Sequence, residues 1–191
     1  INGIDTEKFS PDQSPAAIRE EFSLGDGPVI CHVSRLDQET KLAAAQLIEI
    51  APELAKAFPG LRILLVGGGT AFEELSARAA EVNGALDEPC LLLTGPRTDI
   101  NALVAAGDLF VGVSRAALEA MAAAKPVIVA GNEGYHGLFT ADKLEEACID
   151  TLNDGIMTKD LVGLVDDGVK VTSVNTLEFI KAIRERLETT V

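Results

Sequence analysis

The chain has 191 residues, 47% of them hydrophobic, which is enough to bury a core in one domain or in two small ones. Because 16 Lys and Arg stand against 30 Asp and Glu, the formal charge is -14, and most of the exterior is expected to repel nucleic acids and anionic membrane surfaces. Any phosphate ligand must therefore be held locally. No apolar run approaches the roughly 18 residues that span a bilayer, which predicts no direct membrane insertion.

The segment before the first strand is rich in turn-forming residues. Ser10 to Gly27 contains several Pro, Asp and Gly residues, with one short helical stretch over Ala16 to Phe22. We interpret residues 1–27 as a linker segment.

Five short apolar runs then alternate with four stretches of helical period. The runs are Pro28 to Val33, Leu61 to Val66, Cys90 to Leu93, Leu109 to Val113 and Pro126 to Ala130. The first intervening stretch repeats apolar residues every three or four positions, as at Ala43, Leu47 and Ile50, and Asp99 is expected to cap the third helix. Near-continuous apolar strands joined by helices indicate an α/β fold with a doubly wound parallel sheet, Rossmann-like and covered on both faces.

Beyond the fifth strand the pattern is weaker. A helix is expected around Ala141 to Ala147. Thr172 to Thr190 predicts a terminal helix with one apolar face, capped by Thr172, Ser173 or Asn175.

In a doubly wound sheet a ligand binds beyond the carboxyl ends of the strands, so the loops that follow the strands are expected to line one cleft. These loops gather the candidate site residues. They are Ser34, Arg35, Lys41, Gly67, Gly68, Gly69, Gly95, Arg97, Ser114, Arg115, Glu119, Asn132, Glu133 and Gly134.

One of these loops predicts an anion site. Ser114 and Arg115 stand where a strand gives way to a helix, and the unpaired N–H groups of a helix start favour anions. Glu119 follows one turn later, where it either binds a ligand or complements the helix dipole.

Several motifs follow one another on successive strand–helix units. They are Asn2-Gly3-Ile4-Asp5 with Phe9, Val33-Ser34-Arg35-Leu36-Asp37 with Lys41, Val66-Gly67-Gly68-Gly69, Asp108-Leu109-Phe110-Val111, and Glu119-Ala120-Met121-Ala122-Ala123 with Lys125-Pro126-Val127-Ile128. In this order and spacing they resemble the carboxyl-terminal half of group 1 (family 4) glycosyltransferases, over Ile1 to about Glu133.

The resemblance implies a GT-B architecture of two Rossmann-like lobes. Residues 28–191 would be the lobe that binds the nucleotide-sugar donor, residues 1–27 an interdomain linker, and the amino-terminal acceptor lobe would be absent. A lone donor lobe is expected to be inactive. The resemblance also implies a cytoplasmic enzyme, with any contact to the inner membrane face made through the missing lobe.

Arg35 is the candidate catalytic residue that the resemblance implies. Negative charge grows on the nucleoside diphosphate as the glycosyl bond breaks, and a guanidinium matches that charge. The structural alternative is a surface arginine paired with Asp37 or Glu39. The family's lysine lies five residues after the arginine, where this chain has Thr40, so Lys41 is one position further on.

The remaining loops would contact the donor. Gly67 to Gly69 would let the backbone approach the ligand closely, or form a tight turn without one. Gly95 and Arg97 lie in the loop where the family contacts the nucleobase, although Arg97 can equally pair with Asp99. Glu119 matches the glutamate that accepts hydrogen bonds from the ribose hydroxyls.

The chain departs from the family at one acid. The family places another glutamate eight residues before the second one, in a loop that contacts the sugar, and Val111 stands at that position. Our hypothesis is that Asn132 and Glu133 reach the sugar instead.

Two other function classes stay open. The missing glutamate favours a non-catalytic nucleotide-sugar binding module, and a GT-B enzyme like the UDP-sugar epimerases is the third possibility. No cluster of residues has metal-ligand spacing, so neither a metal nor a cofactor beside the nucleotide sugar is expected. His32 lies within an apolar strand and is expected to be a buried histidine with satisfied hydrogen bonds. The isolated cysteines indicate a reducing compartment.

Overall fold

The computed structural model describes residues 3–132, 134–165 and 168–189. It divides the chain into two compact units, Ile1–Leu138 and Phe139–Val191. Residues 28–191, predicted as one domain, thus include the boundary between the units.

A six-stranded sheet organises the first unit, in the order β3-β2-β1-β4-β5-β6. The strands are β1 Val29–Val33, β2 Arg62–Val66, β3 Leu91–Gly95, β4 Leu109–Gly112, β5 Val127–Gly131 and β6 Gly134–Phe139. β1 to β5 pair in parallel, as the continuous apolar runs predicted. β6 was not predicted, because its two glycines resemble a loop in the sequence.

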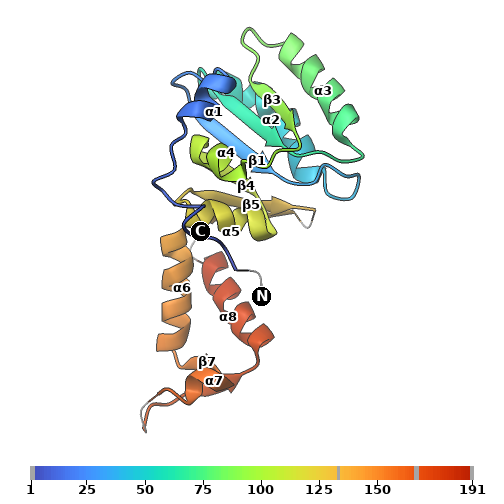
Figure 1. Ribbon diagram of the computed structural model, residues 1–191. Helices are drawn as coiled ribbons and strands as arrows, with labels where there is room; N and C mark the ends of the chain where they lie inside the picture. Colours follow the sequence, from blue (N-terminus) through green and yellow to red (C-terminus); the bar gives the residue numbers. More distant parts are fainter. Residues whose placement is uncertain (1–2, 133, 166–167, 190–191) are drawn as a thin grey trace. The chain divides into compact units, whose positions relative to one another are not determined.

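Five helices pack against this sheet from both faces (Figure 1). They are α1 Ala16–Glu21, α2 Leu42–Ala57, α3 Phe72–Gly84, α4 Ile100–Ala106 and α5 Ser114–Ala122. α2 and α3 contribute to one core cluster, and α1, α4 and α5 to the other. The arrangement confirms the doubly wound, Rossmann-like α/β fold.

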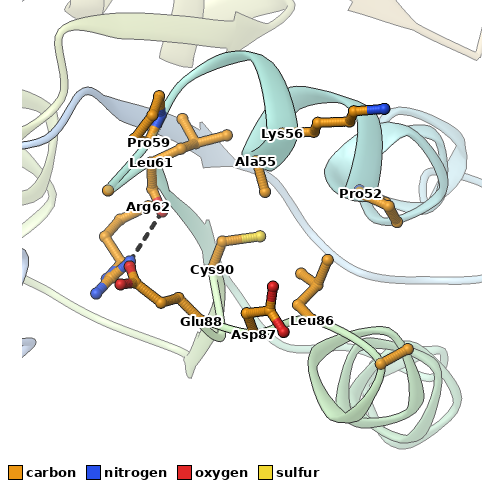
Figure 2. Close-up of a pocket in the computed structure, with 12 residues that line it drawn as sticks. Pro52, Ala55, Lys56, Pro59, Leu61, Arg62, Leu86, Asp87, Glu88 and Cys90 are labelled. Atoms are coloured by element: carbon orange, nitrogen blue, oxygen red, sulfur yellow. Dashed lines mark hydrogen bonds between the residues drawn. The ribbon is translucent and has the colours of Figure 1, made fainter.

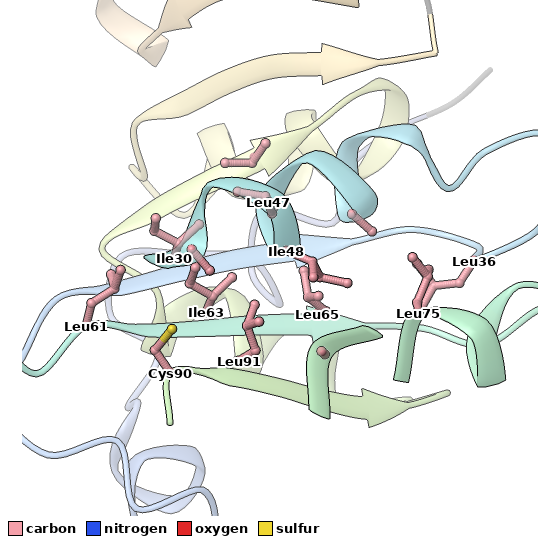
Figure 3. Close-up of a cluster of buried hydrophobic side chains, with 14 of the residues drawn as sticks. Ile30, Leu36, Leu47, Ile48, Leu61, Ile63, Leu65, Leu75, Cys90 and Leu91 are labelled. Atoms are coloured by element: carbon pink, nitrogen blue, oxygen red, sulfur yellow. The ribbon is translucent and has the colours of Figure 1, made fainter. Parts of the chain in front are cut away.

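Side chains of alternate strand residues pack into the two core clusters on opposite faces of the sheet. In Figure 3, Ile30, Ile63 and Leu65 of the strands face Leu47 and Ile48 of α2. Burying one such side chain contributes about 1.5–3 kcal/mol. The intervening strand residues point to the opposite face, which explains why the strands have no polar side.

An aspartate precedes both β4 and α4, and the two side chains form different hydrogen bonds. Asp108 precedes β4, and its Oδ2 accepts from the backbone N–H of Val29 at 2.8 Å. Asp99 stands before α4 as predicted, but its side chain makes no cap hydrogen bond. The prediction that it caps the helix is wrong, because Arg97 engages both of its carboxylate oxygens, at 2.9 and 2.7 Å.

The predicted linker segment contributes to the core of the first unit. Ile18 and Leu24 are buried in the cluster that includes α4 and α5. Arg19 donates to the carbonyl of Ala106 at 3.2 Å and to that of Gly25 at 3.1 Å. These bonds anchor α1 beside the end of α4.

The second unit contains α6 Ala141–Asn153, β7 Ile156–Thr158, α7 Lys159–Val162, β8 Thr172–Val174 and α8 Thr176–Thr189. α6 and α8 pack side by side, and β7 pairs with β8 in parallel. Thr172 and Ser173 lie in β8, so they do not cap the terminal helix. Asn175 caps it: its Oδ1 accepts from the N–H of Glu178, and the Glu178 carboxylate accepts from the N–H of Asn175, both at 3.0 Å.

Among the described residues, no helix is both long and apolar enough to cross a membrane.

Candidate functional site

Two adjoining hollows lie beyond the carboxyl ends of the strands. The larger, about 690 Å³, is bordered by the residues that follow β1, β4 and β5, including Thr40, Ser114, Arg115 and Asn132. The smaller, about 420 Å³, is bordered by the residues that follow β2 and β3. Both hollows include Val33 to Arg35. In the order β3-β2-β1-β4-β5-β6 the connections change direction between β1 and β4, which is where such sheets bind ligands.

Arg35 lies at the border that the two hollows share, and we call its guanidinium uncommitted because no described residue pairs with it. Its side chain is exposed, and within the described ranges it makes no ion pair or side-chain hydrogen bond. Among the described residues, Arg35 forms neither of the alternative pairings, with Asp37 or with Glu39. Asp37 Oδ1 accepts instead from the N–H of Thr70 at 3.0 Å. The Thr40 hydroxyl donates to the Arg35 carbonyl at 2.6 Å and holds the loop.

Lys41 points to a different partner. Its Nζ lies 2.6 and 2.7 Å from the two carboxylate oxygens of Glu74 on α3, and this hydrogen bond lowers the pKa of Glu74. Lys41 is not among the described residues that border either hollow. The position of the family's lysine, Thr40, does border the larger one.

The three glycines after β2 border the smaller hollow. Gly67 has φ +140°, and a Cβ there would lie 1.9 Å from the carbonyl oxygen of Ser34. Gly69 has φ +155°, and its Cβ would lie 2.5 Å from the carbonyl carbon of Leu36. The loop after β2 therefore needs glycine to pack against the loop after β1. Gly95 ends β3 with φ +71° and is not among the described residues that border either hollow.

Arg97 borders the smaller hollow and is fully engaged by protein groups. Besides Asp99, its guanidinium contacts both carboxylate oxygens of Glu21, at 2.6 and 2.9 Å. It also lies 5.6 Å from the centre of the Phe22 ring. The hydrogen bonds from Arg97 lower the pKa of Asp99, and the contacts of Arg97 with Glu21 and Phe22 tie α1 to the start of α4. The pairing with Asp99 that the sequence left open is therefore present.

The start of α5 borders the larger hollow. Ser114 has φ +60°, in the left-handed region that costs a non-glycine residue about 1–3 kcal/mol. Arg115 Nε donates to Glu119 Oε1 at 2.8 Å across one helical turn. The Glu119 side chain is 11% exposed and that of Arg115 61%, so the arginine shields the acid. Of the described residues, Glu119 is not one that borders either hollow.

The loop after β5 contributes Asn132 to the larger hollow. Glu133 lies outside the described residues. Gly134 begins β6 with φ +106°. Val111, where the family has its first glutamate, is a buried residue of β4.

A hydrogen bond between the buried His32 and the half-buried Ser34 joins the site to the sheet. His32 is 2% exposed, its Nδ1 lies 2.8 Å from the Val111 carbonyl oxygen, and its Nε2 lies 2.8 Å from Ser34 Oγ. His32 is thus buried with both ring nitrogens hydrogen-bonded, which confirms the prediction for this residue. The sequence did not predict its hydrogen bond to Ser34, although side chains two residues apart on extended backbone lie on one face, which is a signal for such a contact.

A third hollow, about 610 Å³, lies at the opposite edge of the sheet, where β2 and β3 begin (Figure 2). Its border carries charges of both signs, from Lys56, Arg62, Asp87 and Glu88. It is remote from the carboxyl ends of the strands, where this fold class binds ligands. Within the described ranges, no group of three or more His, Cys, Asp or Glu side chains could hold a metal ion.

Residues 27–188 match the family model described as group 1 glycosyl transferases. The chain belongs to the group 1 glycosyltransferases. It is 31% identical, over 189 residues, to a GDP-mannose-dependent alpha-(1-6)-phosphatidylinositol monomannoside mannosyltransferase of Mycolicibacterium smegmatis, and the match covers 91% of this chain and 44% of that relative.

Solved glycosyltransferase structures share the fold. HepE of Anabaena in complex with UDP has a TM-score of 0.52 and 20% identity, over 98% of this chain and 50% of HepE. The carboxyl-terminal domain of LpcC, a group 1 glycosyltransferase of Francisella tularensis, has a TM-score of 0.55 and 23% identity, over 67% of this chain and 70% of that domain. This group 1 glycosyltransferase chain thus has the Rossmann-like fold of a GT-B lobe, as in the carboxyl-terminal domain of LpcC, and it spans about half the length of the mycobacterial relative and of HepE.

Proposed function

We propose that this chain is the donor-binding half of a glycosyltransferase that transfers a sugar from a nucleoside-diphosphate sugar to an acceptor. The observation that carries the proposal is the uncommitted guanidinium of Arg35, which shares the larger hollow with the start of α5 at the switch point between β1 and β4. In a chain of formal charge -14, this position offers local positive potential.

The diphosphate would lie between Arg35 and the first N–H groups of α5. As the glycosyl bond breaks, negative charge develops on the leaving diphosphate, and the fixed donors of Arg35 and Ser114 to Leu118 would stabilise that charge. Arg115 adds a second guanidinium at the border of the hollow. No metal is required in this scheme, because the protein itself supplies the positive charge.

The other donor groups would lie along the same edge. The ribose hydroxyls would donate hydrogen bonds to Glu119, and the base would contact the loop at Gly95 to Arg97. The sugar would extend toward Asn132 and Glu133. Lys41 would join the diphosphate only by leaving Glu74, and Gly67 to Gly69 would face the donor with backbone atoms. The GDP-mannose dependence of the mycobacterial relative makes GDP the first nucleotide to test, with UDP as the alternative.

The acceptor would bind to an amino-terminal lobe of the same protein. The chain alone would then bind the donor without transferring its sugar. A cytoplasmic enzyme fits the proposed use of a nucleotide sugar, and the amino-terminal lobe would provide any contact with the inner membrane face.

Isothermal titration of the chain with GDP, UDP and ADP tests the proposal. We expect Arg35→Ala to weaken binding of the preferred nucleotide about 10- to 100-fold, because a hydrogen bond to a charged group contributes about 1.5–3 kcal/mol. Glu119→Ala should weaken it less. Arg78→Ala is the matched control, since Arg78 lies on α3 and pairs with Glu49. Unchanged affinity in both the Arg35 and the Glu119 variants would refute the site.

A non-catalytic binding module is the second candidate function. Val111 favours it, because this buried strand residue replaces the acid that grips the sugar in the family. Transfer of sugar by the protein that includes an amino-terminal lobe, and loss of transfer in Arg35→Ala, would exclude this candidate. Tight nucleotide binding without transfer would support it.

A further inference from the structure

The hydrogen bonds of His32 assign a direction to the hydroxyl of Ser34. A backbone carbonyl carries no proton, so the Nδ1 that lies 2.8 Å from the Val111 oxygen must be the protonated nitrogen. His32 is buried, and burial lowers its pKa, so the imidazole is neutral near pH 7 and Nε2 carries a lone pair. The Ser34 hydroxyl, 2.8 Å from Nε2, must therefore donate its only proton to His32.

At the ligand site, Ser34 offers a hydrogen-bond acceptor where its neighbours offer donors. It borders both hollows, directly before Arg35. Arg35, Arg115 and the N–H groups that begin α5 can only donate. With its proton committed to His32, Ser34 Oγ has only lone pairs to offer. A phosphate oxygen placed against it would meet another acceptor, whereas a ligand hydroxyl would meet a partner.

We propose that Ser34 recognises a hydroxyl group of the bound nucleotide sugar, as a hydrogen-bond acceptor oriented by the buried His32. Ser34 is then a binding residue that discriminates a hydroxyl from a phosphate, and His32 is a positioning residue. This inference rests on the proposed function.

Titration of the wild-type chain, Ser34→Ala and Ser34→Thr with GDP-mannose, GDP and inorganic pyrophosphate tests the proposal. Ser34→Ala should weaken GDP-mannose binding about tenfold and leave pyrophosphate binding unchanged, because pyrophosphate lacks the ribose and sugar hydroxyls of GDP-mannose. Ser34→Thr keeps the hydroxyl and should restore the affinity. A loss shared by GDP places the recognised hydroxyl on the ribose, and a loss confined to GDP-mannose places it on the transferred sugar.

Two results would overturn the proposal. One is an equal loss of pyrophosphate affinity in Ser34→Ala, which would make Ser34 a phosphate donor. The other is unchanged affinity for all three probes.

A ligand-free measurement separates this inference from the proposed function. Imidazole ¹⁵N NMR should show His32 as the Nδ1–H tautomer, with an Nε2 resonance that shifts in Ser34→Ala. The Nε2–H tautomer would overturn the inference even if nucleotides bind. If the wild-type chain binds none of the nucleotides, the proposed function fails, and the tautomer still decides the direction of the Ser34 hydroxyl.

Discussion

Two residues at the site adopt states that are costly by themselves. Ser114 has φ +60°, in the left-handed region that disfavours a residue with a Cβ, at the first position of α5. His32 is a titratable side chain buried within the sheet. Strain and buried polar groups concentrate at functional sites, where the surrounding fold compensates for them. Both residues border the larger hollow, which agrees with its proposed role.

The buried His32 should make stability depend on pH. Its folded pKa lies below the unfolded value of 6.5, so the unfolded chain binds more protons in the interval between the two values. The free energy of unfolding should therefore fall as the pH drops from 7 to 5. His32→Phe, which cannot be protonated, should lose this part of the pH dependence. Urea unfolding of both proteins at pH 7, 6 and 5 measures the difference, and parallel pH profiles would contradict the expectation.

At the scale of elements, the site depends on two loops that touch. The loop after β2 lies so close to the loop after β1 that the hydrogen position of Gly67 faces the Ser34 carbonyl. The backbone N–H of Leu36 donates to the carbonyl of Gly68 at 3.0 Å, and that of Ala71 to the carbonyl of Leu36 at 2.8 Å. These contacts hold Ser34 and Arg35 in place at the end of β1.

Gly67→Ala should therefore destabilise the chain strongly. The left-handed φ costs about 1–3 kcal/mol, and the backbone clash adds about as much, so a loss of about 3 kcal/mol is expected. Gly84→Ala is the matched control, because Gly84 ends α3 with no atom within 4 Å of an added Cβ. Chemical denaturation of the two variants measures the contrast. Equal stabilities would show that the loop shifts freely, and the account of these contacts would be wrong.

Local sequence patterns predicted the elements of the first unit well and those of the second unit less well. Strands β1 to β5 are continuous apolar runs because helices cover both faces of the sheet. β6, β7 and β8 were not predicted, since β6 contains two glycines and β7 and β8 have only three residues each. The side-chain partners of Lys41, Arg97 and Glu119 were harder to predict from the sequence. Each of these side chains has several acids or bases nearby, and only the fold determines which of them it contacts.

At the scale of the whole molecule, a strongly acidic chain keeps one cationic side chain uncommitted at its switch point. The described lysines and arginines near the site are engaged in ion pairs, Lys41 with Glu74, Arg97 with Glu21 and Asp99, and Arg115 with Glu119, whereas Arg35 is not. Under the proposed function, this difference separates Arg35, which would bind the ligand, from arginines and lysines that hold the fold together. The central claim is that the diphosphate of a sugar donor binds here.

A crystal structure of the chain with GDP tests that claim most directly. We expect the diphosphate in the larger hollow, within hydrogen-bond distance of the Arg35 guanidinium and of the first N–H groups of α5. A diphosphate bound in the hollow at the opposite edge of the sheet, beside Lys56 and Arg62, or one that leaves Arg35 without contact, would contradict it.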